Sequence, residues 1–342
     1  MSESRTNDAP TKNLLDDTLA SVRFLQVPGG RGNVIRVATA GSGPLVLMVH
    51  GFPESWFSWR HQIPAIAEAG FTAAAMDVRG YGGSDKPMGV ENYTLLELAN
   101  DIAAVIDAFG AASAVIVGHD WGGPQVYAAS IVHPNRVRAV IGLSAPWSNY
   151  VDKKPSTTWA GLYGSDFYYQ SYFWTPGVAE AEIEPDVGRF IRRFYYGLSG
   201  DSPQLVNPLW QPAPARTLLN ALPDPGNGLS WLADVEIAYY THSFVAGGMT
   251  APLNRYRAVD LDIEQLRPYA DRRIEQPALF IAGARDPARY MVPGAGDRYR
   301  DPVPRFRDLR GRHVLEQVGH WIQQEAPTQV NALVLSFLKS IA

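Results

Sequence analysis

GHDWG, residues 118–122, joins the apolar run Ala114–Val117 to a segment that predicts a helix. A strand-to-helix turn of the form Gly-x-nucleophile-x-Gly holds its central residue in a strained conformation above the sheet. Small neighbours permit so sharp a bend and leave the side chain of Asp120 exposed at the end of the strand. The turn therefore predicts a parallel sheet with a reactive carboxylate at its edge.

Apolar runs alternate with predicted helices on both sides of this turn. Leu45–Val49, Thr72–Asp77 and Val137–Leu143 indicate buried strands, because each is short, apolar and bounded by turn residues. A helix is expected from Ser55, and Thr94–Phe109 places its apolar residues on one helical stripe. The alternation predicts an α/β fold with a mostly parallel central sheet flanked by helices.

The alternation is interrupted once, which suggests an insertion into one core. Val22–Ala40 predicts two strands joined by a Gly-rich turn, and the first part of the core covers residues 21–148. Residues 149–270 are rich in Tyr, Trp and Phe and predict short helices, which we interpret as a helical cap. The core resumes over residues 271–342, with strands and a closing helix expected at Ala278–Ala282, Val314–Val318 and Pro327–Ile341.

Composition excludes several classes of function. The 342 residues contain no cysteine, which rules out disulfides, thiolate metal sites and a cysteine nucleophile. Thirty basic and 34 acidic residues give a net charge of −4, which does not fit a nucleic-acid partner. The seven histidines lack metal-ligand spacing, and no phosphate-binding loop is recognisable, so neither a metal nor a cofactor is expected.

The termini and charge runs carry little further information. No apolar run reaches the roughly 18 residues that a membrane helix needs. Residues 1–20 are polar and show no signal-peptide core, so we expect a flexible N-terminal extension and a cytoplasmic protein. The Arg-rich segment Arg298–Arg312 is interpreted as a solvated face. Oligomeric state, monomer or homodimer, cannot be predicted from the sequence.

At residues 118–122 the sequence resembles the α/β-hydrolase family, with Asp120 where esterases and lipases carry serine. The family order is nucleophile, acid, histidine, and each follows a strand. Asp286 follows the strand expected to end at Ala282, and His320 follows the one expected to end at Val318. Three placements in the family order make a catalytic triad the favoured interpretation.

Two further features support this assignment. The second acid location of the family lies in the segment 144–149, which contains no carboxylate and leaves Asp286 as the acid. The segment His50-Gly51-Phe52-Pro53 resembles the oxyanion-hole loop of the family. The resemblance implies that the backbone amides of Phe52 and Trp121 donate to the oxyanion, while His50 and Pro53 are structural.

The nucleophile type predicts the reaction. A carboxylate attacks an sp³ carbon and becomes an alkyl ester, whose hydrolysis then requires a base, an activated water and an oxyanion hole. Epoxides and alkyl halides are the two substrate types suited to this chemistry on this fold. An epoxide generates an alkoxide on ring opening and needs an acidic hydroxyl nearby, a role for which tyrosine is suited.

Tyr169 precedes Gln170, and Tyr256 lies in Asn254-Arg255-Tyr256-Arg257; both segments closely resemble the lid of α/β-fold epoxide hydrolases. From about Val22 onward the chain is similar to epoxide hydrolases of the soluble and microsomal type. The resemblance implies conversion of an apolar epoxide and water to a vicinal diol. It also implies that the two tyrosines polarise the epoxide oxygen and that Phe52 and Trp121 bind substrate, without a cofactor.

Two other interpretations remain open. Haloalkane and haloacetate dehalogenases use the same aspartate nucleophile. Haloalkane dehalogenases commonly carry Asn at the position of Phe52, and haloacetate dehalogenases typically carry Arg at the position of Trp121. A catalytically inactive binding protein of the same fold would usually lack one member of the triad. The sequence favours an epoxide hydrolase over both.

Overall fold

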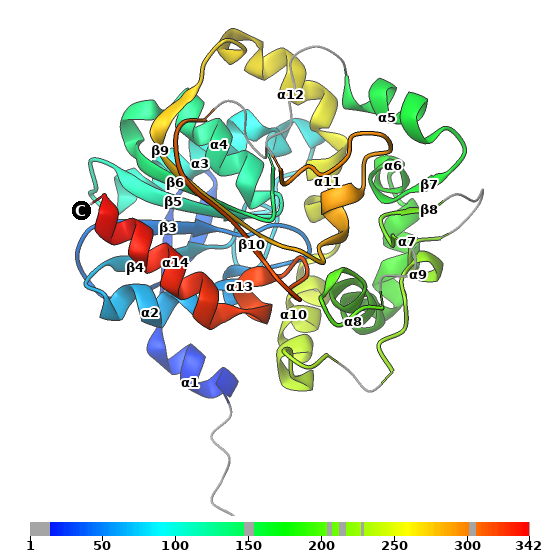
Figure 1. Ribbon diagram of the computed structural model, residues 1–342, viewed down its shortest axis with the longest axis horizontal. Coiled ribbons are helices and arrows are strands. Elements are labelled where there is room, and N and C mark those ends of the chain that lie inside the picture. The colour runs from blue at the N-terminus through cyan, green and yellow to red at the C-terminus, as the bar shows by residue number, and fades with distance from the viewer. Residues whose placement is uncertain are drawn as a thin grey trace, which may run out of the picture.

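The computed structural model describes residues 14–146, 154–203, 207–211, 217–226, 229–300 and 306–341. Over these residues an eight-stranded sheet runs in the order β1-β2-β4-β3-β5-β6-β9-β10 (Figure 1). The β1/β2 and β2/β4 pairs are antiparallel, and the other neighbours are parallel. The strands are β1 Arg23–Pro28, β2 Val34–Ala40, β3 Leu45–Val49, β4 Thr72–Met76, β5 Ala114–His119, β6 Val137–Leu143, β9 Ile274–Gly283 and β10 Phe306–Leu315.

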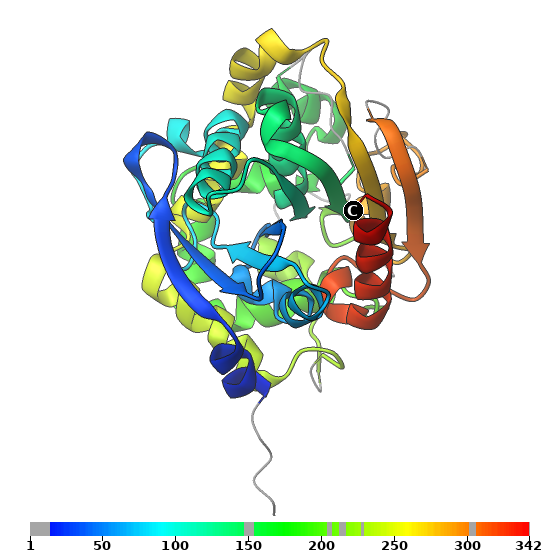
Figure 2. The same cartoon turned by 90° about the vertical axis from the view of Figure 1, so that its left-hand side faces the viewer.

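Helices cover both faces of the sheet. Figure 2 shows α3 and α4 on one face and α2 and α14 on the other. Thr94 caps α3 by accepting a hydrogen bond from the amide of Glu97, and the apolar stripe of this helix is buried. These helices are α2 Gln62–Glu68, α3 Leu95–Ala108, α4 Gly122–Val132, α13 Ile322–Glu325 and α14 Pro327–Ser340.

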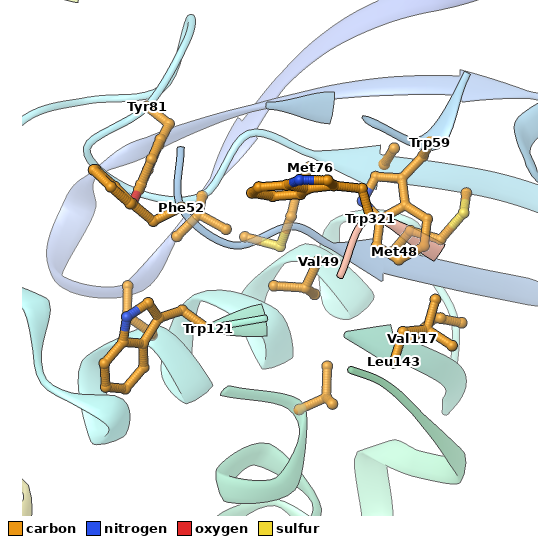
Figure 3. Packing of buried hydrophobic residues seen from close by; sticks show 14 of the residues in the cluster. Met48, Val49, Phe52, Trp59, Met76, Tyr81, Val117, Trp121, Leu143 and Trp321 are labelled. Atoms are coloured by element: carbon orange, nitrogen blue, oxygen red, sulfur yellow. The ribbon is translucent and has the colours of Figure 1, made fainter. Parts of the chain in front are cut away.

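The core is centred on β3 and β5, whose residues are all buried. Met48 and Val49 of β3 lie with Met76 of β4 and Val117 of β5 in one apolar cluster (Figure 3). Strands buried on both faces require continuous apolar runs, which is why these segments could be predicted from the sequence. The rigid central strands place the carboxyl ends of β3 and β5 side by side.

A helical segment is inserted between β6 and β9 and lies beside the sheet in Figure 1. Helix α8 shows how it is built, because Val187, Phe190, Ile191 and Phe194 recur at helical spacing and are buried. The inserted segment also contains a small antiparallel sheet of two strands, β7 Phe167–Tyr168 and β8 Trp210–Gln211. Its helices are α5 Pro155–Tyr163, α6 Tyr169–Trp174, α7 Val178–Ile183, α8 Val187–Leu198, α9 Leu218–Ala221, α10 Asp234–Gly247, α11 Thr250–Arg257 and α12 Val259–Leu266.

The predicted strand–helix alternation is confirmed, with three corrections. Ser55 caps the 3₁₀ helix Trp56–Trp59, and the α-helix expected there begins at Gln62. The last strand ends at Leu315 and not at Val318, because a turn at residues 316 and 317 follows it.

The third correction concerns the N-terminal extension. Residues 14–20, expected to be flexible, belong to the helix α1 Leu14–Ser21, and the preceding part of the extension lies outside the described residues. None of the helices in the described ranges combines the length and apolar character needed to cross a membrane.

Candidate active site

The turn after β5 holds Asp120 by backbone contacts. Asp120 has φ = 50°, a left-handed conformation that is strained for a non-glycine residue. A Cβ at Gly118 would lie 2.2 Å from the carbonyl oxygen of Gly122, and one at Gly122 would lie 2.0 Å from that of Val49. Both positions therefore require glycine, and the predicted strained turn is confirmed.

The two carboxylate oxygens of Asp120 have different partners. Oδ1 accepts a 2.8 Å hydrogen bond from the backbone N–H of Phe52, and Oδ2 lies 3.3 Å from Nε2 of His320. Burial by itself would raise the pKa of Asp120, but the hydrogen bond and charge of His320 and the Phe52 amide lower it below its usual value. The lowered pKa favours the ionised carboxylate, the form that the predicted nucleophile requires.

His320 lies between two carboxylates. Its Nδ1 donates a 2.8 Å hydrogen bond to Oδ2 of Asp286, whose Oδ1 accepts one from the amide of Ala288. Burial would lower the pKa of His320, but the charges and hydrogen bonds of Asp286 and Asp120 raise it well above its usual value. The structure thus brings together the three residues that the sequence placed after separate strands.

The loop that carries His320 is held by Glu325. The carboxylate of Glu325 accepts hydrogen bonds from the amides of Gly319, Trp321 and Gly200, at 2.7 to 2.9 Å. The amide of His320 itself donates to the carbonyl oxygen of Leu198, at the end of α8. The turn between β10 and His320, which the sequence did not predict, is thereby tied to the inserted helices.

Phe52 and Trp121 contribute both backbone and rings. The N–H of Phe52 points at Asp120, and the amide of Trp121 lies at the N-terminus of α4, where helix N–H groups lack intrahelical partners. The guanidinium of Arg255 lies over the ring of Trp121, 4.8 Å from the ring centroid. The ring centroids of Trp121 and Tyr256 are 5.3 Å apart. The ring of Phe52 also contacts Tyr256, at 5.3 Å. Both rings form an apolar wall beside Asp120.

The two predicted tyrosines face the same cavity. Tyr169 begins α6 and Tyr256 lies on α11, and their ring centroids are 5.9 Å apart. Burial, together with the charge of Asp120, raises the pKa of both hydroxyls far above 10, so both are protonated. By contrast, Tyr168 stacks on Tyr163, and the hydroxyl of Tyr172 donates to Glu182.

This cavity lies between the sheet and the inserted helices. Its wall is mainly apolar and aromatic, as is usual for a small-molecule site. It also includes the polar side chains of Asp120, His320, Tyr169 and Tyr256. Its apolar and small lining residues are Phe52, Trp121, Pro124, Ala145, Pro146, Phe194, Leu198, Leu209, Ala288 and Met291.

Sequence reasoning missed two groups at the site. Tyr299, in the segment interpreted as a solvated face, is fully buried and donates a 2.6 Å hydrogen bond to Oδ2 of Asp286. Arg298 lines the cavity, so the solvated-face interpretation is wrong for both residues. The one usable signal was a lone tyrosine between arginines, and that pattern alone does not indicate burial.

The second missed group consists of Glu54 and His119, the residue that precedes Asp120. The ring nitrogens of His119 contact Oε2 of Glu54 at 2.7 Å and the carbonyl oxygen of His320 at 2.8 Å. Gln323 donates to the other oxygen of Glu54. His50 was expected to be structural, and its ring bonds to the backbone of Gly51 and Val78 confirm this.

Within the described residues no group of three or more His, Asp or Glu side chains is arranged to hold a metal ion.

The profile of the α/β hydrolase fold family matches residues 44–327. Epoxide hydrolase A of Mycobacterium tuberculosis is 37% identical over 336 residues, which cover 97% of this chain and 98% of that protein. The chain belongs to the epoxide hydrolase family of α/β hydrolases.

Solved structures agree with this membership. An epoxide hydrolase from an endophytic Streptomyces has a TM-score of 0.86 and 40% identity, covering 94% of this chain and 96% of its own. Epoxide hydrolase A of Mycobacterium thermoresistibile has a TM-score of 0.84 and 38% identity, covering 93% and 98% respectively. The fold expected from the sequence, an α/β-hydrolase core with an inserted helical cap, is confirmed.

Proposed function

We propose that this enzyme converts an apolar epoxide and water to a vicinal diol through an ester on Asp120. The observation that carries the proposal is that Asp120 lines the same cavity as Tyr169 and Tyr256, whose hydroxyls are protonated. Residues 149–270 act as the cap, and residues 21–148 and 271–342 form the core. The names of the relatives support the same substrate class.

In the first step Oδ2 of Asp120 attacks a ring carbon of the epoxide, because Oδ1 is held by the Phe52 amide. The C–O bond of the ring breaks, and the oxygen takes a proton from a tyrosine. The hydroxyl oxygen of Tyr169 accepts a 2.7 Å hydrogen bond from Nε2 of the Gln170 side chain. The proton of Tyr169 is therefore free to point at the epoxide oxygen, and Tyr256 donates from the adjacent wall.

The second step uses the change in charge that the first step produces. Once Asp120 is an ester it no longer carries the negative charge that raises the pKa of His320. The pKa of His320 falls, and the neutral ring removes a proton from water while Asp286 orients it. The hydroxide attacks the Asp120 carbonyl carbon, and the amides of Phe52 and Trp121 stabilise the oxyanion on Oδ1. Collapse of this intermediate breaks the bond between the carbonyl carbon and the ester oxygen, and the departing oxygen takes the proton held by His320 to complete the diol. The proton of the new Asp120 carboxyl group returns through solvent to the tyrosinate, which restores the resting enzyme.

His320→Gln tests this scheme. The variant lacks the base for hydrolysis but keeps the nucleophile, so we expect the styrene oxide adduct of Asp120 to accumulate and turnover to fall at least about 10³-fold. Intact-mass analysis under substrate excess measures the adduct, and peptide mapping locates it. Asp120→Asn serves as the control that forms no adduct, and an unmodified His320→Gln chain would refute the covalent route.

A substrate panel separates the family alternatives. Styrene oxide, an aliphatic epoxide, a haloalkane, fluoroacetate and a simple ester are compared, with diol, halide and acid measured separately. We expect diol from the epoxides and no halide release, because the side chain of Phe52 offers no N–H donor for a leaving halide. Halide release faster than diol formation would assign the enzyme to the dehalogenases instead.

A further inference from the structure

Tyr299 contacts the proposed triad at its acid. The ring is fully buried against Phe280 of β9, with centroids 5.5 Å apart. Its hydroxyl lies 2.6 Å from Oδ2 of Asp286 and 3.2 Å from the carbonyl oxygen of Ser144. Burial and the adjacent Asp286 raise the pKa of Tyr299 well above 10, so the hydroxyl is a neutral donor.

Oδ2 of Asp286 therefore receives two hydrogen bonds, one from Tyr299 and one, at 2.8 Å, from Nδ1 of His320. Oδ1 is occupied by the amide of Ala288. The phenol carries a single proton, and the shorter contact directs it to the carboxylate. A donor on Oδ2 withdraws negative charge from the atom that holds the imidazole, so it weakens the hold of Asp286 on a protonated His320.

We propose that Tyr299 is a positioning residue that fixes the carboxylate of Asp286 and limits the basicity of His320 during ester hydrolysis. The inference rests on the proposed function. It assigns Tyr299 to the second step alone, because Tyr299 does not line the cavity and its hydroxyl bonds to Asp286 and to the backbone of Ser144, not to Asp120. Without the phenol, His320 retains its proton to higher pH and is a base in a smaller fraction of molecules.

Several other charged or titratable groups surround this pair and act in both the wild type and a Tyr299 variant. Near His320 and Asp286 these groups are Asp120, His119, Glu54, which contacts His119, and Glu325 of α13. Around Tyr299 they are Arg289, Asp297, Arg298 and Arg312. A change confined to Tyr299 leaves these groups in place, so a shift in the pH profile reports on the phenol.

Tyr299→Phe removes the donor and keeps the ring. With styrene oxide, we expect the alkylation rate in single turnover to stay within about twofold of wild type. Ester hydrolysis should be slowed about tenfold near pH 6 and approach the wild-type rate near pH 9, with the acidic limb of the profile moved up by about one unit. Rapid quench with intact-mass analysis measures both rates.

Tyr127→Phe is the matched control. Tyr127 is also fully buried, and its hydroxyl donates to the carbonyl oxygen of Ala145, the residue after Ser144. This variant loses a buried phenol beside the same strand end without contact to Asp286. We expect lower stability with an unchanged pH profile.

If Tyr299→Phe does not fold, 3-fluorotyrosine at position 299 keeps the ring and strengthens the donor. The acidic limb should then move down by a few tenths of a pH unit. Three results would overturn the role of Tyr299: an acidic limb that does not move, ester hydrolysis slowed equally at all pH values, or a slowed alkylation step. If wild-type enzyme forms no ester with styrene oxide, the proposed function fails instead.

Discussion

The two regions that form the cavity are held by different kinds of contact. Around Asp120 the contacts are backbone against backbone, and a Cβ at Gly122 would lie 2.0 Å from the carbonyl oxygen of Val49. Around the tyrosines the contacts are between aromatic rings; the ring centroids of Phe173 and Tyr256, for example, are 4.8 Å apart. Backbone atoms in a central strand cannot move aside, whereas side chains can repack.

This difference matches what each region must do. As the proposed nucleophile, Asp120 requires one fixed atomic position, and a strained turn between a buried strand and a helix supplies it. The inserted helices supply hydroxyls and apolar walls, whose shape sets which epoxide fits. The core should therefore tolerate almost no change at the turn, and the insertion should tolerate several.

The largest effect is expected at the turn. Gly122→Ala forces a methyl group against the end of β3, which should destabilise the fold by at least about 3 kcal/mol and abolish epoxide turnover. Gly161→Ala in α5 is the control, because its Cβ meets nothing within 4 Å and alanine favours the helix by about 0.5–1 kcal/mol. Denaturant unfolding of both variants measures the difference, and equal stabilities would remove the contrast.

A smaller effect is expected from the two tyrosine hydroxyls. Tyr169→Phe and Tyr256→Phe should each lower kcat about tenfold, because the other hydroxyl remains, and the double variant should lose about 10³-fold. The fold should be retained, since both rings stay in place. Tyr172→Phe, on the same helix as Tyr169, should keep nearly full kcat. Full activity in the double variant would show that the leaving oxygen takes its proton elsewhere.

The smallest effect concerns Glu325, which joins the two regions. Burial raises the pKa of this carboxyl to about 7, although three backbone N–H groups favour its charged form. A raised folded-state pKa means that the folded state binds the proton more tightly, so the contribution of Glu325 to stability is fully present below pH 4.5. This contribution is lost as the pH rises towards 7, and the free energy of unfolding falls by about 2 kcal/mol. The loss is smaller than the full pKa shift would give, because the side chain is partly exposed.

Glu325→Gln should remove this pH dependence. Unfolding in denaturant between pH 4.5 and 8 should show a flatter stability profile for the variant than for the wild type. Glu182→Gln is the control in the inserted helices, where the carboxylate also accepts backbone N–H groups, from Leu218 and Leu219. Parallel profiles for wild type and Glu325→Gln would show that this carboxyl does not titrate in the range.

Much of the site could be predicted because it depends on local sequence. The turn at Asp120 has a glycine spacing that sterics demand, and Asp286 and His320 follow strands whose carboxyl ends meet at one edge of a parallel sheet. Tyr169 and Tyr256 were found by resemblance, and the cavity wall distinguishes Tyr169 from its neighbours Tyr168 and Tyr172.

Other features depend on contacts between distant segments. Tyr299 lies among arginines in a segment that resembles a surface loop, and its burial against Phe280 and Asp286 is a property of the folded chain. Glu325 contacts Gly200 across 125 positions of sequence. The edge strand β10 alternates exposed and half-buried residues, so its polar composition hid both its length and its true end at Leu315.

The sequence by itself determined the architecture and the reaction class and predicted Asp120 as the nucleophile, because apolar periodicity and glycine sterics act between near neighbours. The tertiary structure decided which polar groups surround the triad residues, which tyrosine faces the cavity, and how the loop of His320 is attached to the inserted helices. Hydrogen bonds between segments far apart in the chain depend on the packing of the whole core, and no local pattern encodes them.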